Sequence, residues 1–165
     1  MKILFDLSKY CREGYGIIDK VRLAIWLPFS VVFTSWLPGS FWRIYLLKAF
    51  GAIVGSGVII KPGVKIKQPW LLQLGNYVWI GEGVWIDNIA EVKIGSNVCV
   101  SQMVYFCTGN HDYKSIDFAL SAQPIIIKDS VWIGARSTIL PGCFIASNQV
   151  FSACSKISVS SLVKK

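Results

Sequence analysis

The sequence contains one histidine, His111, and its five cysteines include no CxxC pair. A zinc site built by the chain itself needs several His or Cys ligands at short spacing, so the sequence predicts no metal centre. An odd number of cysteines without paired spacing also argues against a disulfide framework. We therefore expect a protein of a reducing, cytoplasmic compartment.

Long hydrophobic runs are missing from the first fifty residues. The stretch LAIWLPFSVVFTSWL at 23–37 is apolar but shorter than the roughly 18 to 20 residues that a membrane span requires, and Pro28 interrupts it. Asp6 and Lys9 break the apolar character of residues 1–16, so no signal peptide is expected there. The sequence therefore predicts neither a transmembrane helix nor an exported protein.

Acidic residues are scarce: nine Asp and Glu stand against 17 Lys and Arg, which gives a formal net charge of +8. The excess is spread evenly, with +4 in residues 1–50 and +4 in residues 51–165. Because no basic run with interleaved aromatics marks a groove, we expect no nucleic-acid partner. The charge is equally compatible with anionic phosphates or a membrane surface.

Residues 1–50 are expected to form a helical preface before the main domain. Its segment SFWRIYLLKAF opens with Ser40 as a helix N-cap and carries Arg43 among aromatic and aliphatic residues, while Lys20 and Arg22 flank the preceding apolar stretch. Aromatic and cationic residues around an apolar face favour the headgroup region of a bilayer. Two interpretations stay open: peripheral contact with the inner face of the membrane, or packing over the end of the domain or a subunit partner.

A large apolar residue returns at every sixth position from residue 54 onward, a period that is neither helical nor alternating. The positions are Val54, Ile60, Ile66, Leu74, Ile80, Ile86, Ile94, Val100, Phe106, Ile127, Ile133, Ile139, Ile145, Phe151, Ile157 and Val163. This hexapeptide repeat predicts an all-β fold, a parallel β-helix over residues 51–165. Three units would close a triangular coil of about 18 residues, about six coils would stack, and helices in residues 20–50 would cap the N-terminal end.

Two stretches carry a family resemblance. They are YVWIGEGVWIDNIAEVKIGSNVCVSQMVYFCTGNHDY at 77–113 and VWIGARSTILPG at 131–142. Both are similar to the left-handed β-helix hexapeptide-repeat acyltransferases, and the first stretch is similar in particular to the colanic-acid and exopolysaccharide O-acetyltransferase branch. The resemblance implies a homotrimer that binds acetyl-CoA in the clefts between neighbouring prisms. It also implies direct transfer of the acetyl group to a small-molecule or glycan acceptor, without a covalent acyl-enzyme.

The repeat is interrupted after Phe106, which predicts a protruding loop near 107–124. Long loops in a repeat array are disfavoured unless they are functional. This loop holds His111, the one imidazole able to take a hydroxyl proton near pH 7 and pass it to a leaving thiolate. The resemblance places His111 at the family's catalytic histidine.

The side chains that would orient this imidazole or bind the acceptor are left open by the sequence. Asp112 and Asp87 are the carboxylates favoured to orient His111, with Asp117 and Glu82 as further candidates. The polar residues expected to contact the acceptor are Glu82, Asn88 and Asn110. Asx side chains at such positions are also typical of turns.

The motif VWIGARSTILPG resembles the family segment that lines the pantetheine tunnel. The resemblance implies that Trp132 packs against the cofactor arm and that the backbone N–H of Ala135 acts as the oxyanion donor. Arg136 is expected to meet a phosphate of CoA, with a solvated edge charge as the alternative. Ala153 and Ser155 match positions at the adenine end of the site.

The last hexads keep their period but lose their glycines, and the family's usual tail is missing. Lys156, Lys164 and Lys165 are therefore the candidates for phosphate contacts. The main hypothesis is an acetyl-CoA-dependent O-acetyltransferase acting on a sugar hydroxyl of an exopolysaccharide or its precursor. Two alternatives are an acyl-ACP-dependent sugar acyltransferase and a catalytically impaired β-helix scaffold.

Overall fold

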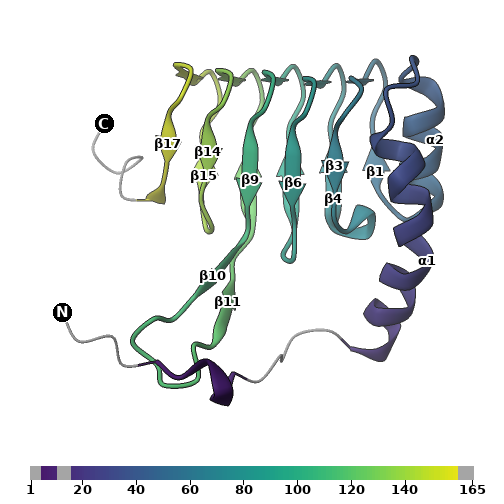
Figure 1. Cartoon of the computed structure of the whole chain (residues 1–165). Helices are drawn as coiled ribbons and strands as arrows, with labels where there is room; N and C mark the ends of the chain where they lie inside the picture. The colour runs from purple at the N-terminus through teal and green to yellow at the C-terminus, as the bar shows by residue number, and fades with distance from the viewer. Residues whose placement is uncertain (1–4, 11–15, 160–165) are drawn as a thin grey trace.

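The computed structural model describes residues 5–10 and 16–159, which form a prism of strands with helices at one end (Figure 1). The N-terminal elements are the 3-10 helix η1 (Leu7–Lys9), α1 (Ile17–Thr34) and α2 (Phe41–Ala49). A second 3-10 helix, η2 (Pro69–Leu71), interrupts the strands that follow. Within the described residues, the main helices therefore precede residue 50 and the strands follow it.

Three parallel sheets of five strands each form the faces of the prism. Face A contains β1 (Ile53–Val54), β4 (Leu72–Leu74), β7 (Val92–Ile94), β12 (Ile125–Ile127) and β15 (Phe144–Ile145). Face B contains β2 (Ile59–Ile60), β5 (Trp79–Ile80), β8 (Cys99–Val100), β13 (Trp132–Ile133) and β16 (Val150–Phe151). Face C contains β3 (Lys65–Ile66), β6 (Trp85–Asp87), β9 (Tyr105–Cys107), β14 (Thr138–Ile139) and β17 (Lys156–Ile157). The fold is the left-handed parallel β-helix that the sequence and its resemblance predict.

The residues of the six-residue repeat form the core of this prism. Every predicted inward residue from Val54 to Ile145 is buried, and so is Ile157. Phe151 is half-buried and packs against the same core, while Val163 lies outside the described residues. The hexapeptide spacing is therefore confirmed as the determinant of the fold.

The coils differ in length, and the described residues form five of them where about six were expected for the whole repeat. On face A the register pairs residue 53 with 73 and 73 with 93, so the first coils repeat every 20 residues. Residue 126 pairs with 144, which gives 18 residues in a later coil. Between them the predicted protruding loop is confirmed as an antiparallel hairpin, β10 (Gly109–His111) and β11 (Leu120–Ala122), that projects from the prism (Figure 1).

The helices α1 and α2 cover the first coil, whose strands would otherwise leave unpaired backbone groups at a sheet edge. Trp26 Nε1 donates to the carbonyl oxygen of Ile66 on β3 at 2.9 Å. The hydroxyl of Ser40 bonds both the N–H and the carbonyl of Ile60 on β2, at 3.1 Å each. Ser40 is the N-cap residue of α2, as the sequence predicts, but its side chain makes no cap hydrogen bond to that helix.

Two expectations about the preface are corrected. Pro28 lies inside α1 on its exposed side and does not end the helix. Arg43 is fully buried, and its desolvation lowers the pKa of the guanidinium below its usual value. Its N–H groups donate over 2.6–3.2 Å to the carbonyl oxygens of Phe33, Ser35, Leu37 and Gly39. Arg43 thus fixes the turn between the two helices and is not a surface cation.

Candidate functional site

His111 ends β10 in the projecting hairpin and is held between two aromatic rings. Its imidazole stacks on the ring of Phe118, with centroids 4.4 Å apart and planes within 6°. Tyr10, from the N-terminal segment, meets the imidazole edge-on at 5.6 Å. Together with Leu7, these residues line a hollow of about 470 Å³. The imidazole is therefore half-buried and has defined neighbours on two sides.

One hydrogen bond sets the tautomer of this imidazole. Nδ1 of His111 lies 2.8 Å from the carbonyl oxygen of Phe118. A carbonyl oxygen can only accept, so in the neutral ring Nδ1 carries the proton and Nε2 keeps its lone pair. Phe118 has a φ of 50°, an uncommon conformation for a bulky residue, in the turn that leads to β11. The hairpin therefore presents Nε2 as a proton acceptor.

The carboxylates of the hairpin hold its turn. Asp112 accepts a hydrogen bond from the backbone N–H of Lys114 at 2.9 Å, and Asp117 accepts one from the hydroxyl of Ser115. Within the described residues, no carboxylate is hydrogen-bonded to the ring of His111. The group that orients the imidazole is thus a backbone carbonyl, and not the Asp112 carboxylate that the sequence suggested.

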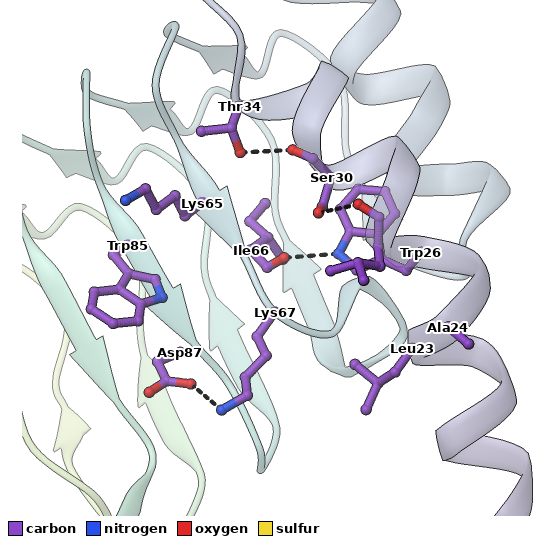
Figure 2. A pocket seen from close by; sticks show the side chains of 11 residues that line it. Leu23, Ala24, Trp26, Ser30, Thr34, Lys65, Ile66, Lys67, Trp85 and Asp87 are labelled. Atoms are coloured by element: carbon purple, nitrogen blue, oxygen red, sulfur yellow. Dashed lines mark hydrogen bonds and ion pairs between the residues drawn. The ribbon is translucent and has the colours of Figure 1, made fainter.

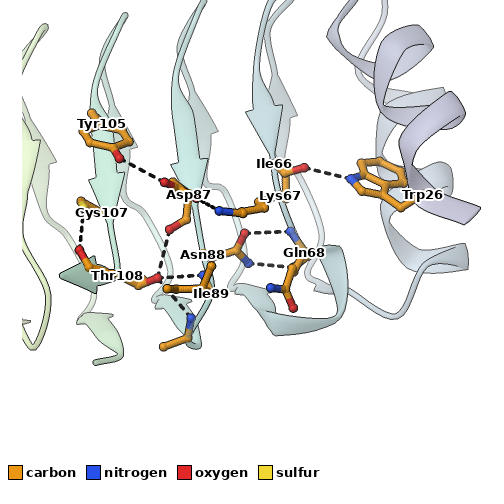
Figure 3. A network of polar contacts seen from close by, with 12 residues as sticks. Trp26, Ile66, Lys67, Gln68, Asp87, Asn88, Ile89, Tyr105, Cys107 and Thr108 are labelled. Atoms are coloured by element: carbon orange, nitrogen blue, oxygen red, sulfur yellow. Dashed lines mark hydrogen bonds and ion pairs between the residues drawn. The ribbon is translucent and has the colours of Figure 1, made fainter. Parts of the chain in front are cut away.

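Asp87, at the end of β6, belongs to a polar network on face C (Figure 3). One of its carboxylate oxygens lies 2.7 Å from Nζ of Lys67, and the other accepts the hydroxyl of Tyr105 at 3.1 Å. Burial, with the nearby thiol and the Asp87 carboxylate, raises the pKa of Tyr105 well above its usual value, so the phenol stays a donor. Both oxygens of Asp87 are used on face C, which corrects its expected role beside His111 in the same chain.

Asn88 is fully buried at the corner between faces C and A. Its Oδ1 accepts the N–H of Gln68 at 3.0 Å and its Nδ2 donates to the carbonyl of Gln68 at 2.7 Å (Figure 3). One coil further along, Thr108 binds the backbone of the preceding coil in a similar way, because its hydroxyl oxygen accepts the N–H groups of Ile89 and Ala90. A buried amide bonded on both sides has no atom to offer a ligand, so Asn88 is removed from the acceptor-binding residues.

Trp132 and Glu82 come together in a groove on face B. This hollow of about 470 Å³ is also lined by Trp79 and Gln102. Trp132 is 52% exposed, and its Nε1 donates to the hydroxyl of Ser101 at 3.0 Å. Aromatic surfaces beside a few polar groups can pack against a ligand and fix its orientation.

The corner between faces B and C carries the Gly134-Ala135 pair. A Cβ on Gly134 would collide with the backbone nitrogen of Ala153 in the next coil, so only glycine allows the coils to stack here. The carbonyl of Ala135 accepts the N–H of Cys154 at 2.8 Å. For the N–H of Ala135, no acceptor is found among the described residues, and the Arg136 side chain beside it is exposed. The corner thus combines a backbone donor with a cation.

The other predicted cofactor residues lie between β16 and β17, at the same corner between faces B and C, one coil further along. Ser155 is tied into the coil, because its N–H donates to the hydroxyl of Ser137 and its own hydroxyl donates to the carbonyl of Ser152. Lys156 starts β17 and is exposed on face C. Lys164 and Lys165 lie outside the described residues.

A further hollow of about 540 Å³ lies between α1 and face C (Figure 2). Leu23 and Leu27 line its helical side, and Lys65 and Trp85 line its sheet side. Of the predicted site residues, Asp87 lines this hollow. It shares no lining residue with the pocket of His111.

The predicted residues therefore fall into separate places on one chain. His111, Asp112 and Asn110 belong to the hairpin, whereas Trp132 and Glu82 line the groove on face B. The pocket of His111 and the groove of Trp132 have no lining residue in common. Within residues 5–10 and 16–159, no three His, Cys, Asp or Glu side chains gather as a metal site.

Two residues of the His111 pocket were missed from the sequence. Phe118 has a signal that could have identified it, since it is an aromatic residue in an inserted, mostly polar loop. No sequence signal marks Tyr10, because it lies about a hundred residues before His111 and only the fold brings the two rings together.

Comparison with known proteins gives a family relation. No protein-family model matches the chain. The chain is 36% identical over 155 residues to the "Putative colanic acid biosynthesis acetyltransferase WcaF" of Escherichia coli (strain K12), which covers 92% of this chain and 85% of that protein. An alignment that covers 92% of the chain includes coils, the hairpin and most of the helical preface.

Solved structures give the same fold. A hexapeptide-repeat-containing acetyltransferase from Vibrio cholerae O1 biovar eltor, complexed with acetyl coenzyme A, has a TM-score of 0.74 at 19% identity and covers 89% of this chain and 87% of its own. A galactoside acetyltransferase in complex with coenzyme A has a TM-score of 0.73 at 21% identity, covering 93% of this chain and 83% of its own. At such identities the likeness establishes the architecture.

Proposed function

The chain belongs to the hexapeptide-repeat acetyltransferases, in the colanic-acid and exopolysaccharide branch, and from this premise we propose that it acetylates a sugar hydroxyl of an exopolysaccharide or its precursor. Membership makes it an acyltransferase that uses acetyl-CoA. The observation that carries the proposed mechanism is the hydrogen bond from Nδ1 of His111 to the carbonyl of Phe118, which leaves Nε2 as a base.

The residues around the corner between faces B and C fit the donor. Acetyl-CoA supplies the thioester carbonyl that is attacked and the thiolate that leaves. The N–H of Ala135 can donate to that carbonyl oxygen, since no other acceptor is found for it in the described chain. Trp132 offers an exposed ring to the pantetheine arm. The residues proposed for the phosphates and the adenine end are Arg136, Lys156, Ala153 and Ser155.

His111 moves one proton in this mechanism. Nε2 accepts the proton of the sugar hydroxyl as its oxygen forms the bond to the acetyl carbon. When the carbon–sulfur bond breaks, Nε2 returns the proton to the sulfur, so the enzyme ends as it began. The carbonyl of Phe118 accepts the Nδ1–H throughout and stabilises the positive charge that the ring carries in between. The acetyl group therefore passes directly to the acceptor.

A second chain is needed to complete this site. The hairpin projects from the prism and its His111 pocket shares no residue with the groove that contains Trp132 (Figure 1). We place the hairpin of one subunit against the corner of its neighbour in a homotrimer, because three equivalent clefts then each receive one His111. Glu82 in the groove and Asn110 on the hairpin are the proposed acceptor contacts, since both side chains are exposed.

Acetyl transfer to a panel of sugar acceptors tests the mechanism. His111→Ala is expected to lower turnover by about 10²- to 10⁴-fold, as for the loss of a general base. Lys114→Gln, an exposed position on the same hairpin, is the control and should leave turnover unchanged. Retention of wild-type turnover in His111→Ala would refute His111 as the base.

Thermal unfolding with acetyl-CoA tests the donor separately. A ligand that prefers the native state raises the unfolding midpoint with its concentration, and we expect this rise in both the wild type and His111→Ala. If a high concentration of acetyl-CoA does not raise the unfolding midpoint and the enzyme turns over acyl-ACP, then acyl-ACP replaces acetyl-CoA as the proposed donor. No rise and no turnover with either donor would leave a scaffold.

A further inference from the structure

The helix α1 has an apolar side that faces solvent. Its buried residues are Trp26 and Phe33, two turns apart on the side that contacts the β-helix. Val21, Ile25 and Val32 share one stripe of the helix, about a third of a turn away from those two residues, and each of them is more than half exposed. Half of the exposed large hydrophobic side chains in the described chain lie between residues 17 and 45. A surface helix that is apolar on its outer side is not stabilised by water on that side.

This apolar side continues onto α2. Ile25 of α1 and Ala49 of α2 line the same hollow, so the outer sides of the two helices adjoin. At the other end of the helices, Trp36, Phe41 and Tyr45 are 74%, 72% and 76% exposed. We call this combined surface of α1, α2 and their connecting turn the cap surface. It lies at the end of the prism, away from the hairpin (Figure 1).

The charges near the cap surface are mainly positive and lie at its border. From residue 23 to residue 37 the sequence contains no charged residue. Lys20 and Arg22 are exposed in the first two turns of α1, and Lys48 is exposed on α2. Asp19, the acidic residue of α1, is half-buried. No helix in the part of the chain that the structure describes is long and apolar enough to cross a bilayer.

We propose that the cap surface docks on an anionic bilayer, with α1 lying in the plane of the headgroups. Amphipathic helices with aromatic and aliphatic residues on one side and basic residues at the border bind in this way, with the apolar side about 5–10 Å into the headgroup and acyl boundary. Lys20, Arg22 and Lys48 are placed to meet anionic headgroups. A protein partner would normally pair hydrogen-bonding groups across its interface, whereas the outer line of Val21, Ile25 and Val32 offers none.

The bound orientation follows from where α1 and α2 lie. Because they cover the first coil, the bilayer would contact the end of the prism and the remaining coils would extend away from it (Figure 1). The hairpin with His111 projects from the side of the prism and stays clear of the lipid. Docking therefore needs no change in the fold and does not depend on whether the chain transfers acetyl groups.

Vesicle flotation of the full chain tests this proposal. The wild type is expected to float with vesicles of phosphatidylglycerol and phosphatidylcholine and much less with phosphatidylcholine alone. Because each basic residue near an anionic surface contributes about 1 kcal/mol, Lys20→Gln with Arg22→Gln should lower partitioning about 30-fold. Replacing Ile25 and Val32 by Gln should lower it by at least about tenfold, through the loss of apolar burial.

A matched control separates the cap surface from general hydrophobicity. Phe144 and Val150 are exposed on other faces of the prism, and their replacement by Gln should not change flotation. Every variant should unfold cooperatively on heating with a midpoint close to that of the wild type, which shows that each is folded and keeps the test independent of the proposed activity. Flotation that is absent, or equal for the cap and control variants, would overturn the proposal. So would a change in oligomeric state on Ile25→Gln with Val32→Gln, since a second copy would then be the partner.

Discussion

Replacement of Phe118 is the sharpest test of how the imidazole is positioned. Phe118 acts on His111 twice, since its ring stacks on the imidazole at 4.4 Å and its carbonyl accepts the Nδ1–H at 2.8 Å. Phe118→Ala removes the ring and leaves the carbonyl. An aromatic pair contributes about 0.5–1.5 kcal/mol beyond its buried area, and if this energy holds the base in its reactive orientation, kcat should fall about 2- to 13-fold.

Steady-state kinetics with a fixed acceptor and varied acetyl-CoA measure this effect. We expect kcat to fall while KM for acetyl-CoA stays the same, because the ring contacts the base and not the donor. Phe118→Tyr, which keeps the ring, should restore kcat. Tyr113→Ala, which removes an exposed ring from the same hairpin, is the control. Wild-type kcat in Phe118→Ala would refute the view that the stacked ring orients His111.

Two further predictions concern stability. Because the folded state raises the pKa of Tyr105, its neutral phenol stabilises the fold fully below the unfolded-state pKa of about 10, and this stabilisation is lost as the pH rises toward the higher folded-state pKa. The urea concentration at the unfolding midpoint should therefore fall above about pH 10, and should fall less in Tyr105→Phe. An equal fall in the wild type and the variant would contradict this prediction. Trp26→Phe leaves the buried carbonyl of Ile66 without its donor and should lower the free energy of unfolding by about 1–3 kcal/mol. Trp42→Phe, which loses an exposed hydrogen bond to the carbonyl of Pro38, should lower the free energy of unfolding by less. Equal losses in the two variants, measured by urea unfolding, would show that the buried bond from Trp26 to Ile66 contributes nothing special to stability.

The fold could be predicted from the sequence because one local rule is repeated. A residue such as Ile80 or Ile133 is inward because it follows its predecessor by six positions, and no distant contact is needed to recognise it. The same rule located the hairpin, since only an insertion explains the gap after Phe106. The prediction of about six coils is too high because the first coils hold 20 residues and the coil with the hairpin holds 33, where 18 were expected.

The roles of Asn88 and Arg43 and the group that orients His111 could not be predicted, because they depend on contacts between coils and between distant segments. Asn88 has the residue type of a ligand contact, and only its burial against Gln68 shows that it serves the backbone. Arg43 looked like a surface cation until its carbonyl partners were placed around it. The orienting group for His111 is a main-chain carbonyl, which any residue type possesses and no motif marks.

Every departure from the six-residue spacing falls at the corner between faces C and A. Inward residues are eight positions apart from Ile66 to Leu74, and the hairpin occupies the same corner two coils later, whereas the other two corners keep six residues throughout. The residues added at this corner lengthen an outward projection, and the strands before and after it stay paired in register. This edge therefore holds inserts of very different length, from two extra residues after Ile66 to a whole hairpin after Phe106, while the stacked coils on either side keep the same three faces.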